Sequence, residues 1–535
     1  MKKLAGVLFA LSLALAGCQL GASGGAVPPD SAEISTRSGV TYEIYVASFH
    51  DSDGDQVGDL NGIKEKLPYL QKLGVEYLWL MPIHPSHSYH KYDVDDYMAI
   101  DPAYGTMNDF RGLIKAARAK GIKIIMDMVI NHSSSNHPWF KKALAEAKAG
   151  KLDGYASYYN FGEKPIRKST KIGSNLYYES AFTENMPDLN LDNPKVREEL
   201  TKIAKFYLNM GVAGFRLDAA LHYFGTNNQA NIEFLKWYTQ MCHSINPHAY
   251  LVAEVWAGKS TVAPYYASGL DSLFNFDLSD GGGEIVKAVN KGDATNLVKY
   301  LSQYEPEIRK LNPRALDAIY LSNHDQGRSA GFFPNLEKNK LAEAIYLWLP
   351  GRPYIYYGEE VGLKGSGRDE NKRTFMPWDK STKVKNPENT DYDPKKQVTT
   401  TVAQAQADKD SLYNYISQLV AVRNEFPFLQ YADFKAWKND NPAVMAYRAV
   451  ADPKAQLSTD STGSPDSQKT AADNLNAKTS EAVIFHNLGK EPQEISLPKG
   501  HRLVKAMNKD DTVKDGKLHL EPLSSAFTVP DSTGK

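Results

Sequence analysis

Four apolar, strand-like runs that end in charged or histidine side chains constrain the fold of this chain more than any other feature. The runs are residues 122–132 (IKIIMDMVINH), 211–223 (GVAGFRLDAALHY), 249–256 (AYLVAEVW) and 317–326 (DAIYLSNHDQ). Each holds enough apolar residues for a buried strand of a parallel sheet. Because parallel strands that alternate with helices share one rim or edge at their carboxyl ends, we expect the polar ends of the runs to lie together.

The second run places Arg216 two residues before Asp218. In a strand, residues i and i+2 point to the same side, so these two side chains project together. A guanidinium beside a carboxylate favours the ionised carboxylate, and an ionised, fixed carboxylate is a candidate nucleophile. A buried structural ion pair would explain the same pattern, and the other three runs favour the catalytic interpretation.

The other runs supply further polar side chains at their ends: Asp127, Asn131, His132, Glu254, Asn323, His324 and Asp325. In this combination the chain resembles the α-amylase family of glycoside hydrolases (family 13), whose four signature regions are similar to DMVINH, GFRLDAALH, EVW and SNHD here. The resemblance runs from about Thr41 to the end of the expected barrel. It implies a glycoside hydrolase.

Eight candidate strands alternate with amphipathic helical runs, several of which end in a glycine typical of a helix C-cap. The expected helices are residues 60–73, 107–120, 194–210, 231–245, 295–311, 336–349 and 410–426. The expected strands are residues 41–49, 75–82, 122–129, 212–218, 250–255, 270–276, 318–322 and 353–357. An open doubly wound sheet would also fit this order. Polar ends on strands three, four, five and seven favour an α/β fold with a closed (β/α)8 TIM barrel, formed by residues 39–132 and 187–430.

Two further regions accompany the barrel. Residues 133–186 have no clear helix–strand repeat, and we interpret them as a lobe inserted after strand three. Residues 431–535 contain short alternating runs that predict a C-terminal all-β sandwich, with strands at 444–450, 481–485, 494–497, 502–507 and 518–529. Within that domain, residues 452–480 are rich in Ser, Thr, Asp and Ala, and we expect a disordered loop.

The amino terminus resembles an export signal. Two lysines precede an apolar run that is too short for a membrane span and is typical of a signal peptide over residues 1–17. The run ends in Leu-Ala-Gly-Cys, which resembles a bacterial lipobox and predicts lipidation of Cys18; an ordinary signal peptide is the alternative. With the flexible tether at 18–38, this predicts an exported protein, lipid-anchored at the cell surface or the periplasmic face of a bacterial membrane.

Retaining glycoside hydrolysis requires two carboxyl groups about 5–5.5 Å apart, one as nucleophile and one as general acid/base. Asp218 and Glu254 end neighbouring strands, which lie about 4.8 Å apart. Glu254 is flanked by Val255 and Trp256, and apolar neighbours favour its protonated form. We therefore expect Asp218 to be the nucleophile and Glu254 the general acid/base.

The family resemblance implies further roles. Asp325 would be a third catalytic acid, which binds the sugar's 2- and 3-hydroxyls and steadies the cationic transition state. The substrate-binding set would be Tyr92, which resembles the tyrosine that stacks under the sugar, with Asp93, His132, Arg216, Trp256 and His324. Lys91 departs from the glycine that is usual before this tyrosine. Three histidines in this loop (84, 87 and 90) lack the spacing of a zinc motif and are interpreted as rim residues.

Two calcium sites are expected. The segment Asp51–Asp59 (DSDGDQVGD) offers oxygen ligands from Asp51, Asp53, Asp55, the Val57 carbonyl and Asp59, as in the first half of an EF-hand loop. Gly62 at the twelfth position excludes an EF-hand, but the family's calcium loop after strand one is similar. A solvated acidic turn is the alternative. A second, weaker site is implied by the resemblance at Asn131, Asp188 and the carbonyl of His222.

The segment Met186–Asn190 (MPDLN) resembles the family's fifth region, in a form intermediate between oligo-1,6-glucosidases and neopullulanases. Ala219 replaces the valine that follows the nucleophile in 1,6-specific relatives, which favours α-1,4 cleavage of starch, glycogen or maltooligosaccharides. A cyclomaltodextrinase, neopullulanase or transglycosylating oligo-α-glucosidase is the alternative enzyme, and a non-catalytic surface glycan-binding lipoprotein is a remote one. A formal net charge of -1 argues against nucleic acid as a partner, and no protein partner is implied.

Overall fold

The computed structural model describes residues 39–397, 400–451 and 480–531. The predicted signal peptide, Cys18, the tether and nearly all of the predicted loop at 452–480 lie outside these residues. Within the described ranges, no helix combines the length and apolar character that crossing a membrane requires.

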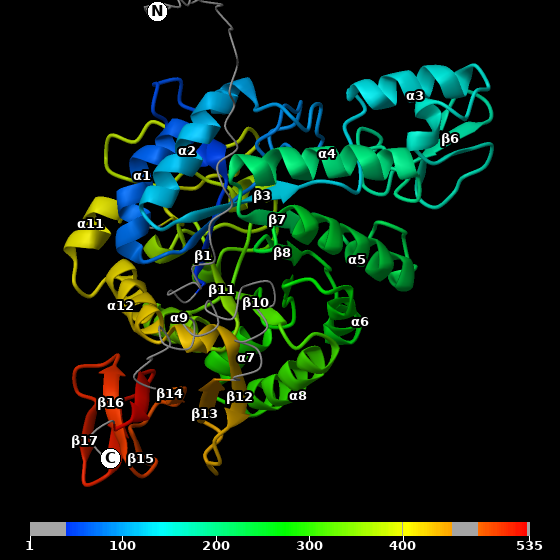
Figure 1. Ribbon diagram of the computed structural model, residues 1–535. Helices are drawn as coiled ribbons and strands as arrows, with labels where there is room; N and C mark the ends of the chain where they lie inside the picture. Colours follow the sequence, from blue (N-terminus) through cyan, green and yellow to red (C-terminus); the bar gives the residue numbers. More distant parts are fainter. Residues whose placement is uncertain (1–38, 398–399, 452–479, 532–535) are drawn as a thin grey trace, which may run out of the picture.

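Eight parallel strands close into a barrel in the order β1-β11-β10-β9-β8-β7-β3-β2 (Figure 1). They are β1 (Thr41–Ile44), β2 (Tyr77–Leu80), β3 (Lys123–Met128), β7 (Gly214–Leu217), β8 (Tyr250–Ala253), β9 (Ser272–Phe274), β10 (Leu316–Tyr320) and β11 (Arg352–Tyr356). Each overlaps a predicted run, so the predicted (β/α)8 barrel is confirmed and the open sheet is excluded. After β1 the chain turns into a short 3-10 helix, η1 (Val46–Ser48), where the sequence predicted a longer strand.

Large side chains fill the interior of the barrel, so that it is a packed core rather than a channel. The buried cluster inside it is Tyr77, Trp79, Ile125, Tyr250, Val252, Phe274, Ala318, Tyr320 and Tyr354. These residues occupy alternate positions on their strands, and the intervening residues face the helices.

Helices surround the barrel and connect its strands. They are α1 (Leu60–Leu73), α2 (Met107–Ala119), α4 (Pro194–Met210), α5 (Asn228–Ile245), α6 (Lys259–Tyr265), α7 (Glu284–Lys291), α8 (Thr295–Leu311), α9 (Leu336–Trp348) and α12 (Leu412–Glu425), with the short α10 (Asp369–Lys372) and α11 (Val402–Ala407). Gly74 and Gly211 end α1 and α4 at φ +90° and +104°, where a side chain would be strained. The sequence did not predict α6, α7, α10 and α11.

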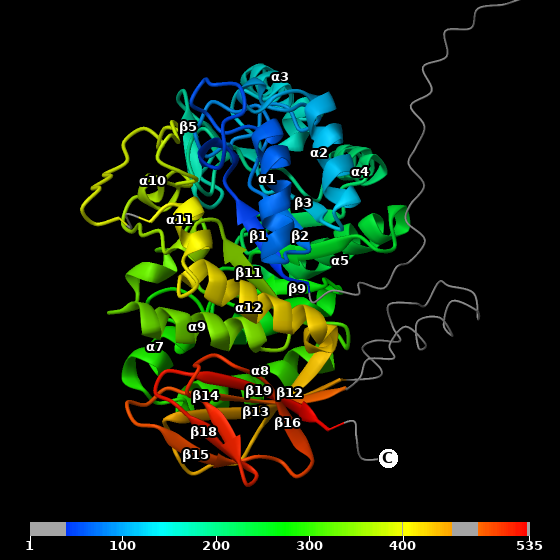
Figure 2. The ribbon, with the colours of Figure 1, turned by 90° about the vertical axis from the view of Figure 1, so that its left-hand side faces the viewer.

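The inserted lobe lies between β3 and α4. It contains α3 (Pro138–Lys148), the 3-10 helix η3 (Tyr155–Tyr158) and a sheet of β4 (Phe161–Gly162), β6 (Leu176–Glu179) and β5 (Ser169–Ile172). The sequence did not predict α3, although His137 caps its amino end and Pro138 occupies its first turn. Figures 1 and 2 place the lobe and the C-terminal sheets at opposite ends of the molecule.

The C-terminal region forms two antiparallel sheets that pack through a shared apolar cluster. One sheet has the order β12 (Ala432–Ala436), β13 (Val444–Ala451), β14 (Glu481–Asn487), β19 (Ser525–Pro530) and β16 (His501–Ala506); the other is β15 (Gln493–Ser496), β18 (Lys517–Leu520) and β17 (Thr512–Lys514). The predicted single run at 518–529 is wrong: it is two strands in different sheets. The turn between them includes Leu523 at φ +54°.

Candidate active site

The register between β7 and β8 places Asp218 and Glu254 at equivalent positions. Leu217 pairs with Ala253, and each of the two acids is the next residue on its strand. The backbone N–H of Glu254 donates to the Leu217 carbonyl at 3.0 Å, which fixes this alignment. Because neighbouring strands lie about 4.8 Å apart, the two carboxyl groups start from adjacent points on the rim.

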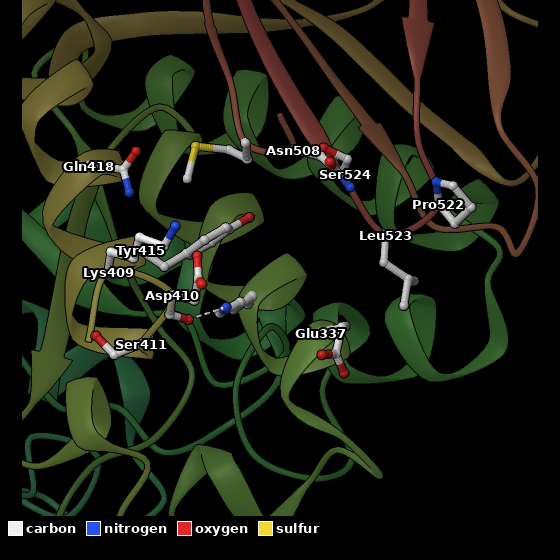
Figure 3. A pocket seen from close by; sticks show the side chains of 12 residues that line it. Glu337, Lys409, Asp410, Ser411, Tyr415, Gln418, Asn508, Pro522, Leu523 and Ser524 are labelled. Carbon is white, nitrogen blue, oxygen red and sulfur yellow. Dashed lines mark hydrogen bonds between the residues drawn. The ribbon is translucent and has the colours of Figure 1, made fainter. Parts of the chain in front are cut away.

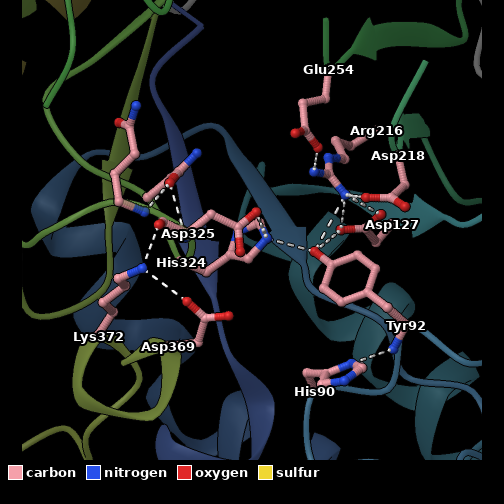
Figure 4. A network of polar contacts seen from close by, with 12 residues as sticks. His90, Tyr92, Asp127, Arg216, Asp218, Glu254, His324, Asp325, Asp369 and Lys372 are labelled. Carbon is pink, nitrogen blue, oxygen red and sulfur yellow. Dashed lines mark hydrogen bonds and ion pairs between the residues drawn. The ribbon is translucent and has the colours of Figure 1, made fainter. Parts of the chain in front are cut away.

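Arg216 joins these two acids to a third. Its Nη1 donates to Asp218 Oδ1 at 2.7 Å and to both oxygens of Asp127 at 2.8 and 2.9 Å, and its Nη2 donates to Glu254 Oε2 (Figure 4). The guanidinium is 1% exposed, whereas the side chains of Asp218 and Glu254 are 10% and 12% exposed. The Arg216 side chain therefore forms the buried floor of the site, whereas the two carboxyl groups above it remain accessible to solvent.

Asp325 is held between two cations on the other side of the same rim. Its carboxylate lies 3.0 Å from Nε2 of His324 and 2.9 Å from Nη2 of Arg373. Nζ of Lys372 donates to the Asp325 carbonyl at 2.6 Å. Burial alone would raise the pKa of Asp325, but His324 and Arg373 outweigh burial and hold it well below its usual range.

Tyr92 connects the two halves of this network. Its hydroxyl donates to Asp127 Oδ2 at 3.0 Å and lies 2.7 Å from His324 Nε2 (Figure 4). Through Tyr92 and Arg216, the polar ends of β3, β7, β8 and β10 form one continuous group. The structure thus brings Asp218, Glu254 and Asp325 together at the carboxyl ends of the strands.

The environment of Glu254 favours its protonated form. Burial raises the pKa of Glu254 to about 7; Arg216 opposes this rise, and the carboxylates of Asp218 and Asp325 add to it. Trp256 does not supply the apolar environment that the sequence suggested, because it is 49% exposed and its ring stacks on Phe276 at 5.1 Å. A carboxyl group that holds its proton near neutral pH can act as a general acid.

The backbone explains why Lys91 is unusual. Lys91 adopts φ +62°, a left-handed conformation that favours glycine, the residue usual there in the family that the chain resembles. Its Nζ donates to Asp101 Oδ2 at 2.5 Å, and both residues are buried. This ion pair offsets the backbone strain and ties the loop that carries Tyr92 to the segment beyond it.

Three predicted substrate-binding residues make other contacts. Asp93 accepts hydrogen bonds from Ser86 and Ser88 of its own loop. Nε2 of His132 donates to the Tyr92 carbonyl at 3.1 Å, and His132 is 1% exposed. Trp256 offers an open aromatic face at the rim, and its ring contact within the described chain is with Phe276 rather than with the acids.

The acidic loop after β1 gathers three of its four aspartates. Ligand atoms of Asp51, Asp53 and Asp59 lie within 4.8 Å of one another, which within the described chain is the one group of three or more acidic, histidine or cysteine side chains placed to hold a metal. Asp55 is not in this group; its Oδ1 accepts from the Val57 N–H. Asp59 also caps helix α1 by accepting from the Gly62 N–H at 2.8 Å.

The second predicted metal set is only partly assembled. Nδ2 of Asn131 donates to Asp188 Oδ1 at 3.2 Å, and both residues are buried. Burial and the nearby Glu179 raise the pKa of Asp188 to about 7. The His222 carbonyl accepts a hydrogen bond from Gly225, and the His222 ring packs on Phe182. His84, His87 and His90 form no metal-binding group among the described residues.

Sequence reasoning missed three residues of this network. Asp127 was noticed at the end of its strand but received no role, and Glu43 and Arg373 were not singled out. Arg373 lies 48 residues after Asp325 in an irregular segment, and Glu43 lies 281 residues before His324, whose Nδ1 it contacts. No local pattern signals such pairs, since only the closure of the barrel brings them together.

A separate cavity of about 410 Å³ lies between the barrel helices and the C-terminal sheets (Figure 3). It is lined by residues such as Lys340, Tyr415, Gln418, Asn508 and Leu523. None of the predicted site residues lines it, so the polar group at the barrel rim remains the candidate active site.

Comparisons with known proteins agree with this geometry. The family model "Alpha amylase, catalytic domain" matches residues 43–432. The chain is 43% identical over 420 residues to "Alpha-amylase 3" of Dictyoglomus thermophilum, covering 77% of this chain and 82% of that protein. It is 36% identical over 355 residues to a "4-alpha-glucanotransferase" of Thermotoga neapolitana, covering 63% of this chain and 76% of that protein.

Among solved structures, the fold is similar to "Eubacterium rectale Amy13B", with a TM-score of 0.83 and 36% sequence identity. That match covers 92% of this chain and 96% of the other. The family model begins within β1 and covers the rest of the barrel, including every strand end that contributes to the polar network. The chain therefore belongs to the α-amylase family and is a glycoside hydrolase.

Proposed function

We propose that this protein is a retaining, endo-acting α-amylase that hydrolyses the α-1,4 bonds of starch, glycogen and maltooligosaccharides. The observation that carries the proposal is the pair of carboxyl groups on one guanidinium: Asp218 and Glu254 both contact Arg216, and burial raises the pKa of Glu254 to about 7. A two-step glycosidase needs such a protonated acid beside a second carboxyl group that acts as nucleophile.

In the first step, the Asp218 carboxylate attacks the anomeric carbon while Glu254 gives its proton to the glycosidic oxygen. The bond between the anomeric carbon and the glycosidic oxygen breaks, and the leaving sugar departs as an alcohol. The other sugar remains bound to Asp218 as a glycosyl ester. In the second step, Glu254 takes a proton from water as the water oxygen attacks the same carbon. This releases an α-anomeric product and restores both carboxyl groups.

The remaining network would stabilise the positive charge that develops on the sugar ring. Asp325, kept ionised by His324 and Arg373, would accept hydrogen bonds from the sugar's 2- and 3-hydroxyls. Tyr92 would stack under the ring, with Arg216 fixing the acids beneath it. Phe276 and the open face of Trp256 would provide an aromatic surface for a neighbouring sugar.

Two alternatives are open to test. The glucanotransferase relative favours a share of transglycosylation, since a sugar hydroxyl can replace water in the second step. A cyclomaltodextrinase or neopullulanase would use the same acids. A catalytically silent glycan-binding protein is disfavoured because Asp218, Glu254 and Asp325 are all present and mutually placed.

The product profile on soluble starch, pullulan and cyclodextrins tests the proposal. An endo-acting α-amylase should shorten starch rapidly and release small maltooligosaccharides. Attack on cyclodextrins or pullulan alone would transfer the assignment to the alternative enzymes. Accumulation of longer oligosaccharides from maltotriose would indicate transglycosylation.

We propose calcium as a structural ion in the loop after β1. Asp51, Asp53 and Asp59 fit it because their carboxylate oxygens are the hard ligands that Ca²⁺ prefers, and three negative groups within 4.8 Å repel one another without a cation. Bound there, the ion would tie the loop to the amino end of α1. The set at Asn131, Asp188 and His222 is a weaker candidate, since Asn131 turns its amide nitrogen towards Asp188.

We propose that the protein is exported and lipid-anchored through Cys18, on the basis of the apolar segment and lipobox-like tetrapeptide in the sequence. Metabolic labelling with a radioactive fatty acid, followed by membrane fractionation, tests this. The full chain should carry label and sediment with membranes, and a Cys18→Ser variant should carry none. An unlabelled wild-type chain would contradict the proposal.

A further inference from the structure

His324 is enclosed by acceptor groups on both sides of its ring. Nδ1 lies 2.5 Å from Oε1 of Glu43. Nε2 lies 2.7 Å from the Tyr92 hydroxyl, whose own hydrogen is donated to Asp127, and 3.0 Å from Oδ2 of Asp325. An ionised carboxylate accepts hydrogen bonds but donates none, so both ring nitrogens must carry hydrogen to satisfy both contacts. The geometry is that of an imidazolium between two carboxylates.

Glu43 reaches this position from the wall of the barrel. It lies on β1 in register with Trp79 of β2 and Tyr356 of β11, and its side chain is 1% exposed. Its carboxylate contacts the imidazole of His324 directly. Trp79 packs edge-to-face against the imidazole at 5.5 Å between ring centroids, and Tyr92 stacks on it at 5.6 Å, so the ring is packed on two sides.

Charged groups surround His324 from several elements. The acidic and phenolic groups that face it are Glu43 from β1, Tyr92 from the loop after β2, Asp127 from β3, Glu254 from the end of β8 and its neighbour Asp325. The cation Arg373 contacts its backbone, since Nε of Arg373 donates to the His324 carbonyl at 3.2 Å. Burial lowers the pKa of His324, but Asp325 and Glu43 outweigh burial and raise it to about 9.

We propose that Glu43 is a positioning residue that holds His324 as a fixed imidazolium, so that its positive charge stays beside Asp325 and the sugar bound there. This inference rests on the proposed function for the sugar, but the state of His324 does not depend on it. The hydrogen bond made by one nitrogen of an imidazole determines whether the other nitrogen carries a proton. Without the charge of Glu43, His324 becomes neutral at a lower pH, and Asp325 loses a cationic partner.

The isosteric variant Glu43→Gln tests the role of the charge. A fall in the pKa of His324 from about 9 to about 7 would lower its charged fraction at pH 8 about tenfold and leave it charged at pH 5.5. We therefore expect kcat/KM to fall on the order of tenfold more at pH 8 than at pH 5.5. The charge of His324 also lowers the pKa of Glu254, so losing that charge would keep Glu254 protonated to a higher pH and would oppose the expected fall rather than cause it. A loss that is the same at both pH values would indicate a merely structural role and overturn the proposal.

Nuclear magnetic resonance of the wild-type protein gives a readout that does not depend on activity. The His324 ring nitrogens, identified by their absence in His324→Asn, should both be protonated at pH 7; a neutral tautomer would refute the inference. In Glu43→Gln the titration should move to lower pH. A starch-inactive enzyme with a charged His324 would instead count against the proposed function alone.

Glu360→Gln is the matched control. Glu360 is also a fully buried glutamate; it accepts hydrogen bonds from Tyr42 and Tyr69, whose rings lie outside the catalytic network. This variant should keep the wild-type pH dependence and the wild-type His324 titration. If it shifts both as Glu43→Gln does, the effect is not specific to Glu43.

Discussion

Each end of the barrel buries an arginine, and the two arginines have different partners. At the carboxyl ends of the strands, Arg216 contacts the carboxylates of Asp127, Asp218 and Glu254. At the amino ends, Arg352 lies between the rings of Tyr77 and Tyr250, with its Cζ 4.3 and 3.7 Å from their centroids. Its Nη2 donates to the side-chain oxygen of Gln430 at 3.0 Å.

The two ends differ in the net charge that remains around each arginine. Arg352 contacts two tyrosine rings and an amide, and the carboxylates of Glu76 and Asp271 lie near enough to act on its charge, so the positive charge at this end is balanced within a closed contact. Arg216 serves three carboxyl groups with one positive charge, and the surplus negative charge faces the opening of the barrel. A site of this kind can stabilise a cation that forms on a substrate, whereas the amino end cannot.

Replacement of the proposed nucleophile should give the largest effect at the carboxyl end. For Asp218→Asn we expect kcat on starch to fall about 10⁴-fold or more, because the amide cannot form the glycosyl ester. The fold should be kept, since the amide oxygen of the new side chain can still accept a hydrogen bond from Arg216. Circular dichroism and initial rates provide the measurement.

Asp317→Asn is the matched control for this experiment. Asp317 is a buried aspartate of β10 that accepts from Nδ2 of Asn275 at 2.7 Å, away from the rim. The control should retain wild-type kcat. Near-normal activity in Asp218→Asn, or an equal loss of activity in both variants, would contradict the claim that catalysis depends on the carboxyl end of the barrel alone.

Glu254 should set the alkaline side of the pH profile. Its pKa is raised to about 7, and the protonated form is the active one, so kcat/KM should fall as pH rises through about 7. Glu254→Gln should lower kcat by about 10²–10⁴-fold and abolish this limb. A variant that keeps the wild-type limb would show that another group controls it.

Arg352→Met should affect stability and leave catalysis intact. Losing two buried ring contacts should lower the free energy of unfolding by about 2 kcal/mol, with kcat unchanged. Urea unfolding measures the stability, and initial rates measure kcat. In Arg216→Met, by contrast, kcat should be lost. A large fall in kcat for Arg352→Met would mean that the two ends are coupled.

Chelation should have the smallest effect, confined to the loop after β1. Removal of calcium should lower Tm by about 1 °C for each kcal/mol of binding free energy lost, measured by calorimetry with and without a chelator. Asp53→Asn should raise the calcium concentration needed to restore Tm. Asp55→Asn, outside the group of three, should not; an unmoved Tm on chelation would argue against a structural ion.

The barrel could be predicted from sequence because its strands carry local signals. Apolar runs before Asp127, Asp218, Glu254 and Asn323, and glycines such as Gly74 and Gly211, mark strand and helix ends without reference to the rest of the chain. The same signals placed the three acids at one rim. Their mutual contacts follow from strand order and register.

What the sequence did not predict depends on long-range packing. Glu43 and Arg373 reach His324 and Asp325 only when the barrel closes and brings β1 and the segment after β11 near the end of β10. The contacts of His132 with the Tyr92 carbonyl, and the turn of Trp256 onto Phe276, are choices of side-chain direction that residue identity leaves open. The break between β18 and β19 at Leu523 depends on the pairing of these two strands in different sheets.

The stereochemistry of the first product tests the central claim most directly. Hydrolysis of a maltooligosaccharide, followed by proton magnetic resonance within the first minutes, distinguishes the anomers before they interconvert. If Asp218 and Glu254 act as neighbouring nucleophile and acid, the α-anomer should appear first. Initial release of the β-anomer would mean direct attack by water and would contradict the account.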